Sequence, residues 1–228
     1  MTINITVGSR NSPLAQAQVN EVLEEIRQHH PQLTFTPLFV ETVGDKDQKT
    51  SLRALGKTDF FTKEVDDLLL NGSCRIAIHS AKDLPEPMPH GLSLIALTKG
   101  LDPADSIVIR SGVTLSTLAS GAKIATSSIR REESVRKLRA DFSFCDIRGT
   151  ISQRLEKLNS GDVDGVVIAE AALIRLRLTH LNRIKLPGDT VPFQGQLAIV
   201  ARSDDNEMEE LFYCIDSREN VRRLRPGL

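Results

Sequence analysis

A short apolar segment in the first half of the chain ends in side chains that could carry out acid–base chemistry. Within Arg75–Pro85, the run Ile76-Ala77-Ile78 is followed by His79, Lys82 and Asp83. Such a run is typical of a strand that is covered on both faces, and ligands of open α/β sheets bind beyond the carboxyl ends of these strands. Lys82 and Asp83 are therefore candidate catalytic residues. A strand end followed by a solvated turn explains the spacing equally well.

Several arginines lie just after other predicted strands or in the helical turns that follow them. The formal net charge of the chain is only -1, so these arginines do not belong to a generally basic surface. Guanidinium groups pair with carboxylates and phosphates through two parallel hydrogen bonds. We expect a small polyanionic ligand, and a solvated rim is the alternative. The arginines in question are Arg10, Arg130, Arg131, Arg148 and Arg175.

Three hydroxyl side chains stand at the start of a predicted helix. Thr126, Ser127 and Ser128 precede an apolar pair, Val135 and Leu138, at helical spacing. Hydroxyls often cap a helix, but the arginines in its first turn oppose the helix dipole. This mismatch favours anion binding over capping alone.

Strands and helices alternate along the chain, which predicts an α/β fold of mixed, mostly parallel sheets with helices on both faces. Pro37 marks one strand as irregular or at an edge. Predicted helices begin at Ser12-Pro13 and end before Asn71 and Gly161, and Asp204 and Glu207 have capping-box spacing before the last helix. The predicted strands span residues 3–7, 33–42, 74–83, 92–97, 106–110, 123–126, 142–147, 163–169 and 197–200.

Composition excludes several classes of function. A chain of 228 residues with this balance of charge predicts one large or two small soluble domains, with no nucleic-acid or membrane partner. We find no leader and no membrane-spanning run, so we expect a cytoplasmic protein. Cys74, Cys145 and Cys214 are widely spaced, which argues against disulfides and a metal site. The polar stretch 44–58 predicts a mobile loop. The arginines within residues 222–225 predict a solvated basic tail.

Five motifs in register resemble the porphobilinogen deaminase family, also called hydroxymethylbilane synthase, over about the first 215 residues. Two places depart from the family pattern, around Lys57 and at Gly195-Gln196-Leu197. The five motifs are Val7-Gly8-Ser9-Arg10-Asn11-Ser12-Pro13-Leu14-Ala15, Phe61-Thr62-Lys63-Glu64, His79-Ser80-Ala81-Lys82-Asp83-Leu84-Pro85, Thr126-Ser127-Ser128-Ile129-Arg130-Arg131 and Ile147-Arg148-Gly149-Thr150.

The resemblance implies two lobes like those of type II periplasmic binding proteins, around a cleft. Lobe 1 is expected to comprise residues 1–98 and 191–216, and lobe 2 residues 99–190, followed by a basic tail at 217–228. Family members carry a third, C-terminal domain, which we expect to be absent here. The apolar stripe of the last helix would then be exposed, which makes a dimer or partner contact plausible.

The resemblance also implies the reaction and the site. The family joins four porphobilinogen molecules head to tail with release of ammonia, in tetrapyrrole (haem) biosynthesis. Asp83 matches its catalytic aspartate, which stabilises an azafulvene cation, with Lys82 and Gln18 nearby. Asp45, Lys57 and Phe61 belong to its loop. Positions that bind substrate and cofactor carboxylates are matched by Arg10, Ser12, Thr126, Ser128, Arg130, Arg131, Arg148, Arg154 and Arg175.

The implied cofactor is dipyrromethane, which the family attaches to a cysteine of the third domain. No equivalent cysteine is evident in this chain, and Cys145 is a weak candidate because it lies only three residues before Arg148. The leading hypothesis is therefore an active porphobilinogen deaminase with an atypically held primer. A non-catalytic binding protein for porphobilinogen or another polycarboxylate, and an inactive relative, are the alternatives.

Overall fold

The computed structural model describes residues 3–51, 53 and 58–218. The chain divides into two compact units. Unit 1 comprises Met1–Lys46, Lys57–Leu101 and Gln196–Leu228, and unit 2 comprises Asp47–Gly56 and Asp102–Gly195. These boundaries differ from the expected lobes in three places: the segment that begins at Asp47 belongs to unit 2, the passage into unit 2 comes after Leu101, and the return to unit 1 comes at Gln196.

Unit 1 is built on a five-stranded sheet in the order β2-β1-β3-β10-β4. Strand β10 runs antiparallel to both of its neighbours, whereas β1 is parallel to β2 and to β3. Pro37 lies on β2, the edge strand that pairs with β1, so the predicted edge is confirmed. The strands are β1 (Ile3–Arg10), β2 (Leu33–Val40), β3 (Ile76–Ser80), β4 (Leu92–Leu97) and β10 (Leu197–Arg202).

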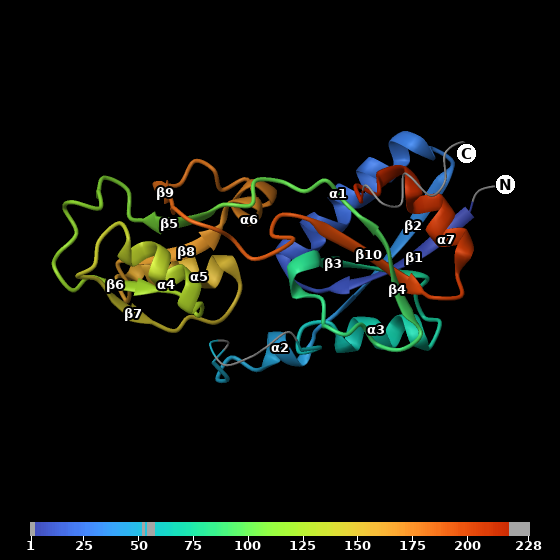
Figure 1. Ribbon diagram of the computed structural model, residues 1–228, viewed down its shortest axis with the longest axis horizontal. Helices are drawn as coiled ribbons and strands as arrows, with labels where there is room; N and C mark the ends of the chain where they lie inside the picture. Colours follow the sequence, from blue (N-terminus) through green and yellow to red (C-terminus); the bar gives the residue numbers. More distant parts are fainter. Residues whose placement is uncertain (1–2, 52, 54–57, 219–228) are drawn as a thin grey trace. The chain divides into compact units, whose positions relative to one another are not determined.

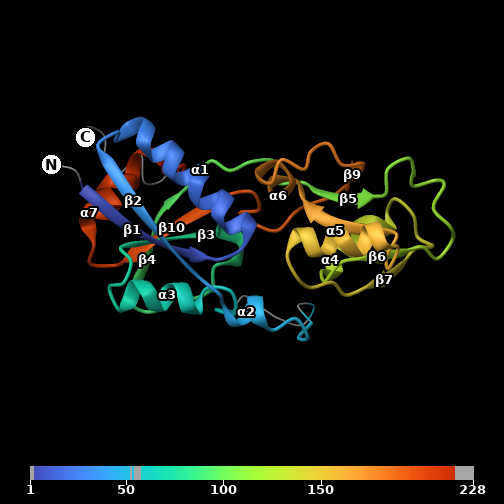
Figure 2. The ribbon, with the colours of Figure 1, turned by 180° about the vertical axis from the view of Figure 1, so that it is seen from behind.

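Helices cover both faces of this sheet, with α1 and α3 on opposite sides in both views (Figures 1 and 2). Helix α1 follows the predicted start, because the Ser12 hydroxyl accepts a hydrogen bond from the Ala15 N–H, 3.1 Å away. The predicted loop 44–58 instead opens with a short helix, α2. The helices are α1 (Pro13–His29), α2 (Val43–Lys46), α3 (Lys63–Leu70) and α7 (Asn206–Phe212).

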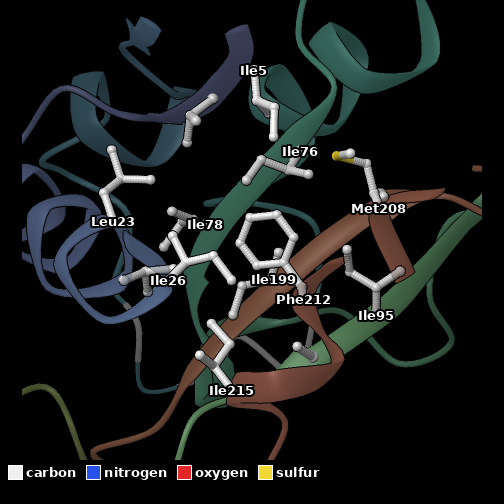
Figure 3. Close-up of a cluster of buried hydrophobic side chains, with 14 of the residues drawn as sticks. Ile5, Leu23, Ile26, Ile76, Ile78, Ile95, Ile199, Met208, Phe212 and Ile215 are labelled. Carbon is white, nitrogen blue, oxygen red and sulfur yellow. The ribbon is translucent and has the colours of Figure 1, made fainter. Parts of the chain in front are cut away.

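The main core of unit 1 lies between the sheet, α1 and α7. Figure 3 shows the ring of Phe212 among the isoleucines of β3 and β10, and Met208 and Phe212 have no exposed surface. The expectation of an exposed apolar stripe on the last helix is therefore wrong, and a dimer contact through it loses its basis. The stripe packs against the unit's own sheet.

The end of unit 1 differs from the sequence prediction in two further ways. Asp205, not Asp204, caps α7, since its carboxylate accepts a hydrogen bond from the Met208 N–H at 3.2 Å. Ser217 and Arg218 are not a free tail. The Ser217 N–H donates to the Leu97 carbonyl at 2.8 Å, and the Arg218 guanidinium donates to two carbonyls of β4. The rest of the predicted tail lies outside the described residues.

Unit 2 contains a second five-stranded sheet, in the order β7-β6-β8-β5-β9. Here β5 is the strand that runs against its neighbours β8 and β9, so four of the five strands share one direction in each sheet. The sequence pattern missed β9, which is short. The strands are β5 (Asp105–Ile109), β6 (Lys123–Ala125), β7 (Ser143–Cys145), β8 (Gly165–Ala169) and β9 (Arg183–Lys185).

Three helices accompany the second sheet. Val135 of α4 is buried with Ile107, Ile124 and Val167, which gives this unit its own core. Helix α5 has a complete capping box at Thr150 and ends at Gly161, whose φ of 84° suits a glycine. The helices are α4 (Ile129–Arg136), α5 (Ile151–Ser160) and α6 (Glu170–Arg175).

Candidate functional site

Asp83 stands on a short 3₁₀ turn, Ala81–Asp83, directly after β3. The strand ends at Ser80, three residues earlier than expected. Two contacts fix the turn: the Gln18 side chain donates to the Ser80 hydroxyl at 2.8 Å, and the Ala81 N–H donates to the Gln196 carbonyl at 3.1 Å. Lys82 and Asp83 are half-buried. The structure thus explains why Gln18 belongs with this turn, since it supports the turn from α1.

Arg10 lies at the end of β1, which is parallel to β3, so both strands end at the same edge of the sheet. Its guanidinium pairs with Asp45 and lies over the ring of Phe61, 4.7 Å from the ring centroid. Burial raises the pKa of Asp45, but hydrogen bonds from Arg10 and Thr42 outweigh it and hold the pKa below its usual range. The structure therefore brings together three of the predicted residues; Lys57 lies outside the described part.

The hydroxyls of unit 2 take part in local hydrogen bonds around the ends of β6 and β7. Ser128 caps α4 by accepting from the Arg131 N–H at 3.4 Å, and the Thr126 hydroxyl accepts from the Ser128 N–H at 3.3 Å. Ser127 bonds both the N–H and the carbonyl of Ile147. The capping alternative is thus realised for Ser128, as it is for Ser12 in unit 1, and their ligand role stays a prediction.

Arg130 and Arg131 both turn toward one buried carboxylate, that of Asp105 at the start of β5. Their Nη2 atoms lie 2.5 and 2.6 Å from its two oxygens, and Gln194 donates to Asp105 at 3.0 Å. Burial raises the pKa of Asp105, but the guanidiniums of Arg131 and Arg130 outweigh that effect and hold it below the ordinary range. This carboxylate explains how two arginines are accommodated in the first turn of α4.

The other three predicted arginines of unit 2 donate to backbone carbonyls. Arg148 donates to Asp47 at 2.6 Å, Arg154 to Gly149 at 2.9 Å and Arg175 to Gly195 at 2.9 Å. All three are partly buried, so their guanidiniums are held on the protein rather than extended into solvent. A shared role of the two units in one site remains a proposal.

Arg53 is a charged residue of unit 2 that the sequence analysis missed. It pairs with Glu132 and with Asp146, and donates to the Thr126 carbonyl at 3.3 Å. Together with the bond from Arg148 to Asp47, these contacts hold Asp47 and Arg53 beside the predicted carboxylate-binding residues. The polar composition of the segment was the available signal, but it does not reveal which partners a long loop reaches.

A buried acid–base pair in unit 1 was also missed. His79 of β3 and Asp66 of α3 are 5% and 3% exposed, with the His79 Nε2 3.5 Å from an Asp66 oxygen. Burial raises the pKa of Asp66 to about 6, and burial, with a contribution from Arg10, lowers the pKa of His79 to about 4. His79 stood in the opening motif, but nothing in the sequence pairs it with Asp66.

The cysteines offer no activated thiol. Cys74 is buried and its pKa is raised to about 11 by burial, while burial also raises the pKa of Cys145 and of Cys214. A thiol becomes nucleophilic when its pKa falls, so all three environments work against covalent attachment. Cys145, at the end of β7, is half-buried, as is Cys214.

Residues 3–51, 53 and 58–218 include no cluster of three or more histidine, cysteine, aspartate or glutamate side chains suited to hold a metal ion. Nor does any helix among them have the length and apolar character needed to cross a membrane.

The fold resembles that of proteins from other functional classes. An ABC transporter periplasmic substrate-binding protein from Coxiella burnetii matches with a TM-score of 0.58 and 15% identity, covering 92% of this chain and 91% of that one. CbnR, a LysR family transcriptional regulator, matches with a TM-score of 0.55 and 13% identity, covering 98% of this chain and 70% of its own. The expected fold, like that of type II periplasmic binding proteins, is confirmed.

Sequence relatives identify the family. A "Probable porphobilinogen deaminase" of Chlamydia pneumoniae is 39% identical over 208 residues, which are 91% of this chain and 88% of the relative. A porphobilinogen deaminase of Chlorobium phaeobacteroides is 36% identical, covering 100% of this chain and 77% of the relative. The family model for "Porphobilinogen deaminase, dipyromethane cofactor binding domain" matches residues 5–210. The chain belongs to the porphobilinogen deaminase family.

Proposed function

We propose that this protein is a porphobilinogen deaminase, a transferase that joins four porphobilinogen molecules head to tail and releases ammonia at each step. The observation that carries the proposal is the family match over residues 5–210, because this span includes every candidate site residue. The relatives named porphobilinogen deaminase support the same activity.

Asp83 is the proposed catalytic residue. Loss of ammonia from porphobilinogen leaves a cationic pyrrole, and a carboxylate held in place stabilises such a cation without reorganisation. The turn that carries Asp83 is fixed by Gln18 from α1 and by Gln196, which directly precedes β10. Rigid support of this kind favours a preorganised carboxylate over a side chain that swings freely in solvent.

The arginines are the proposed partners of the acetate and propionate groups that each pyrrole carries. Arg10, Arg130 and Arg131 pair with carboxylates of the protein itself, which supports their proposed role as partners of ligand carboxylates. The Arg130 Nε–H is buried and has no hydrogen-bond partner within the described residues, so this guanidinium retains a donor.

The same donor set fits the dipyrromethane named in the matching family model. When bound, dipyrromethane supplies the pyrrole to which the first substrate unit is joined. Its acidic side chains would be held by Arg131, Arg148, Arg154 and Arg175. We also propose that the protein works in the cytoplasm, where its free thiols stay reduced.

The test is turnover of porphobilinogen by the purified full chain. Its intact mass is recorded first, so that any bound dipyrromethane is known. The wild type is expected to consume porphobilinogen and yield a product that oxidises to uroporphyrin. Asp83→Asn should lower kcat at least 100-fold, because the isosteric amide cannot stabilise a cation. Asp204→Asn, a change at an exposed aspartate of the same unit, is the matched control. Unconsumed substrate with the wild type would reject the proposal.

A second candidate function is binding of porphobilinogen without turnover. The likeness to a periplasmic substrate-binding protein favours it, since a related fold serves there to hold a ligand. Calorimetry separates the two functions. Binding that survives Asp83→Ala, disappears in Arg131→Ala and is never accompanied by ammonia release would establish the binding protein.

A further inference from the structure

Asp105 is a buried carboxylate that faces the two arginines of α4. Its side chain is 2% exposed, whereas those of Arg131 and Arg130 are 14% and 28% exposed. Each oxygen accepts from a different guanidinium, and Gln194, itself buried, donates to one of them at 3.0 Å. Arg130 is held from a second side, because its Nη1 donates to the Asp189 carbonyl at 2.8 Å.

Both side chains keep some exposed surface, 28% for Arg130 and 14% for Arg131, while each guanidinium donates to Asp105. Charge-assisted hydrogen bonds of this length fix the planes of the two groups, so little rotamer entropy is lost when a ligand arrives. Without the carboxylate, two like charges on adjacent residues would repel each other in a partly buried place. Asp105 therefore keeps both arginines in one arrangement.

The charge of the group is also set by Asp105. Two guanidiniums and one carboxylate sum to a single positive charge, and the pKa of Asp105 lies below its usual range, so the carboxylate is ionised at neutral pH. A ligand carboxylate carries one negative charge and matches this sum. The buried carboxylate repels a dianion such as hydrogen phosphate about twice as strongly as it repels a monoanion, and so offsets the stronger attraction of the two guanidiniums for the dianion.

We propose that Asp105 is a positioning and specificity-determining residue. It aligns Arg130 and Arg131 and makes the pair select singly charged carboxylates over doubly charged anions. This inference rests on the proposed function. The strand β5 places it there, since Asp105 begins a strand whose other residues are apolar or small and which pairs with β8 and β9 inside the sheet.

The test compares anions on the arginine signals themselves. The probes are acetate and inorganic phosphate, titrated against ¹⁵N-labelled full-length protein at pH 8, where phosphate is a dianion. The Nε–H resonances of Arg130 and Arg131 are assigned with the single variants Arg130→Lys and Arg131→Lys. Asp105→Asn is expected to shift the ratio of phosphate to acetate affinity at least tenfold toward phosphate, and to broaden both resonances.

Asp102→Asn is the matched control. It removes the same charge three residues earlier in unit 2, but Asp102 pairs with Lys185 and not with the guanidiniums. In Asp102→Asn, the ratio of phosphate to acetate affinity should change less than twofold. An unchanged ratio in Asp105→Asn, or an equal shift in both variants, would overturn the proposal. Asp105→Glu keeps the negative charge and should retain the wild-type ratio of phosphate to acetate affinity, so it tests the proposal even if Asp105→Asn does not fold. A tenfold shift of that ratio in Asp105→Glu would contradict the proposal.

Steady-state kinetics with porphobilinogen separate this inference from the proposed function. In Asp105→Asn, KM for porphobilinogen should rise about tenfold with kcat changed less than threefold, and inhibition by phosphate should strengthen relative to KM. If the wild type does not turn over porphobilinogen, the proposed function fails, while the acetate and phosphate titration still decides the role of Asp105. If turnover is normal and KM is unchanged in Asp105→Asn, the inference fails alone.

Discussion

The side chains of the candidate site are held in position by specific hydrogen-bond and ion-pair partners. Asp83 was singled out by its place after an apolar run, and the structure adds the contacts from Gln18 and Gln196 that fix its turn. Arg130 and Arg131 were recognised as a mismatch at a helix start. Asp105, which resolves that mismatch, begins a strand 25 residues before Arg130 and gave no signal of its own.

The buried pair of Asp66 and His79 gives a pH-dependent prediction. The folded-state pKa of Asp66, about 6, lies above its ordinary value of 3.8, so its contribution to stability is present at low pH and is lost as the pH rises through 6. Asp66→Asn removes this loss. The variant should gain on the order of 1–3 kcal/mol over the wild type between pH 4 and pH 7.

Urea unfolding at half-unit pH steps measures this difference. His79 contributes in the opposite sense, since its lowered pKa costs stability as the pH falls from 6.5 toward 4; only the difference between variant and wild type is diagnostic. Asp67→Asn removes a neighbouring negative charge that helps to raise the pKa of Asp66, so it should weaken the same pH dependence without abolishing it. A pH-independent gain in Asp66→Asn would show that Asp66 titrates normally.

At the scale of elements, close packing of β1 against α3 explains a motif glycine. Gly8 lies on the face of β1 toward α3, where an added Cβ would meet the Cys74 Sγ at 2.8 Å and Val65 at 3.4 Å. The same strand carries Arg10 at its end. Helix starts at Ser12 and Thr150 and helix ends at Gly72 and Gly161 followed the predicted capping chemistry, because these signals are local.

Gly8→Ala should destabilise the protein by about 1–3 kcal/mol, because the new methyl group overpacks the strand against α3. Adding Cys74→Ala removes the nearest atom and should recover more than half of that loss. The coupling is measured by a double-mutant cycle in urea, with Cys74→Ala alone as the reference. Strict additivity of the two changes would mean that the strain lies elsewhere.

At the scale of the whole molecule, the two units have separate buried cores. Phe212 is fully buried between α1 and the sheet of unit 1, and Ile124 is fully buried in unit 2. The polypeptide passes from one unit to the other several times, yet each sheet is assembled only from strands of its own unit. We therefore expect each unit to unfold as a separate cooperative unit.

Phe212→Ala should cost about 3–5 kcal/mol and Ile124→Ala about 2–5 kcal/mol, each within its own unit. Hydrogen exchange followed by mass spectrometry locates the loss. Phe212→Ala should speed exchange in β1, β3 and β10 and spare β6 and β8, and Ile124→Ala should do the reverse. Equal acceleration of all five strands by either change would show that the chain unfolds as one unit.

The sequence by itself determined what depends on neighbours in the chain: the α/β class, most helices and strands, and the motifs that place the chain in its family. Hydrophobic periodicity and capping act over a few residues, so they can be recognised in a single sequence. Boundaries were less secure, as the early end of β3 and the missed β9 show.

Only the tertiary structure decided which distant residues meet. It buried the last helix within unit 1, joined the segment from Asp47 to unit 2, and paired Asp105 with Arg130 and Arg131 and His79 with Asp66. These pairings depend on the order of the strands in each sheet and on which side chains are buried next to each other. The arginines and Asp83 were therefore predictable as candidates, whereas the Asp105 carboxylate that orients Arg130 and Arg131 was not.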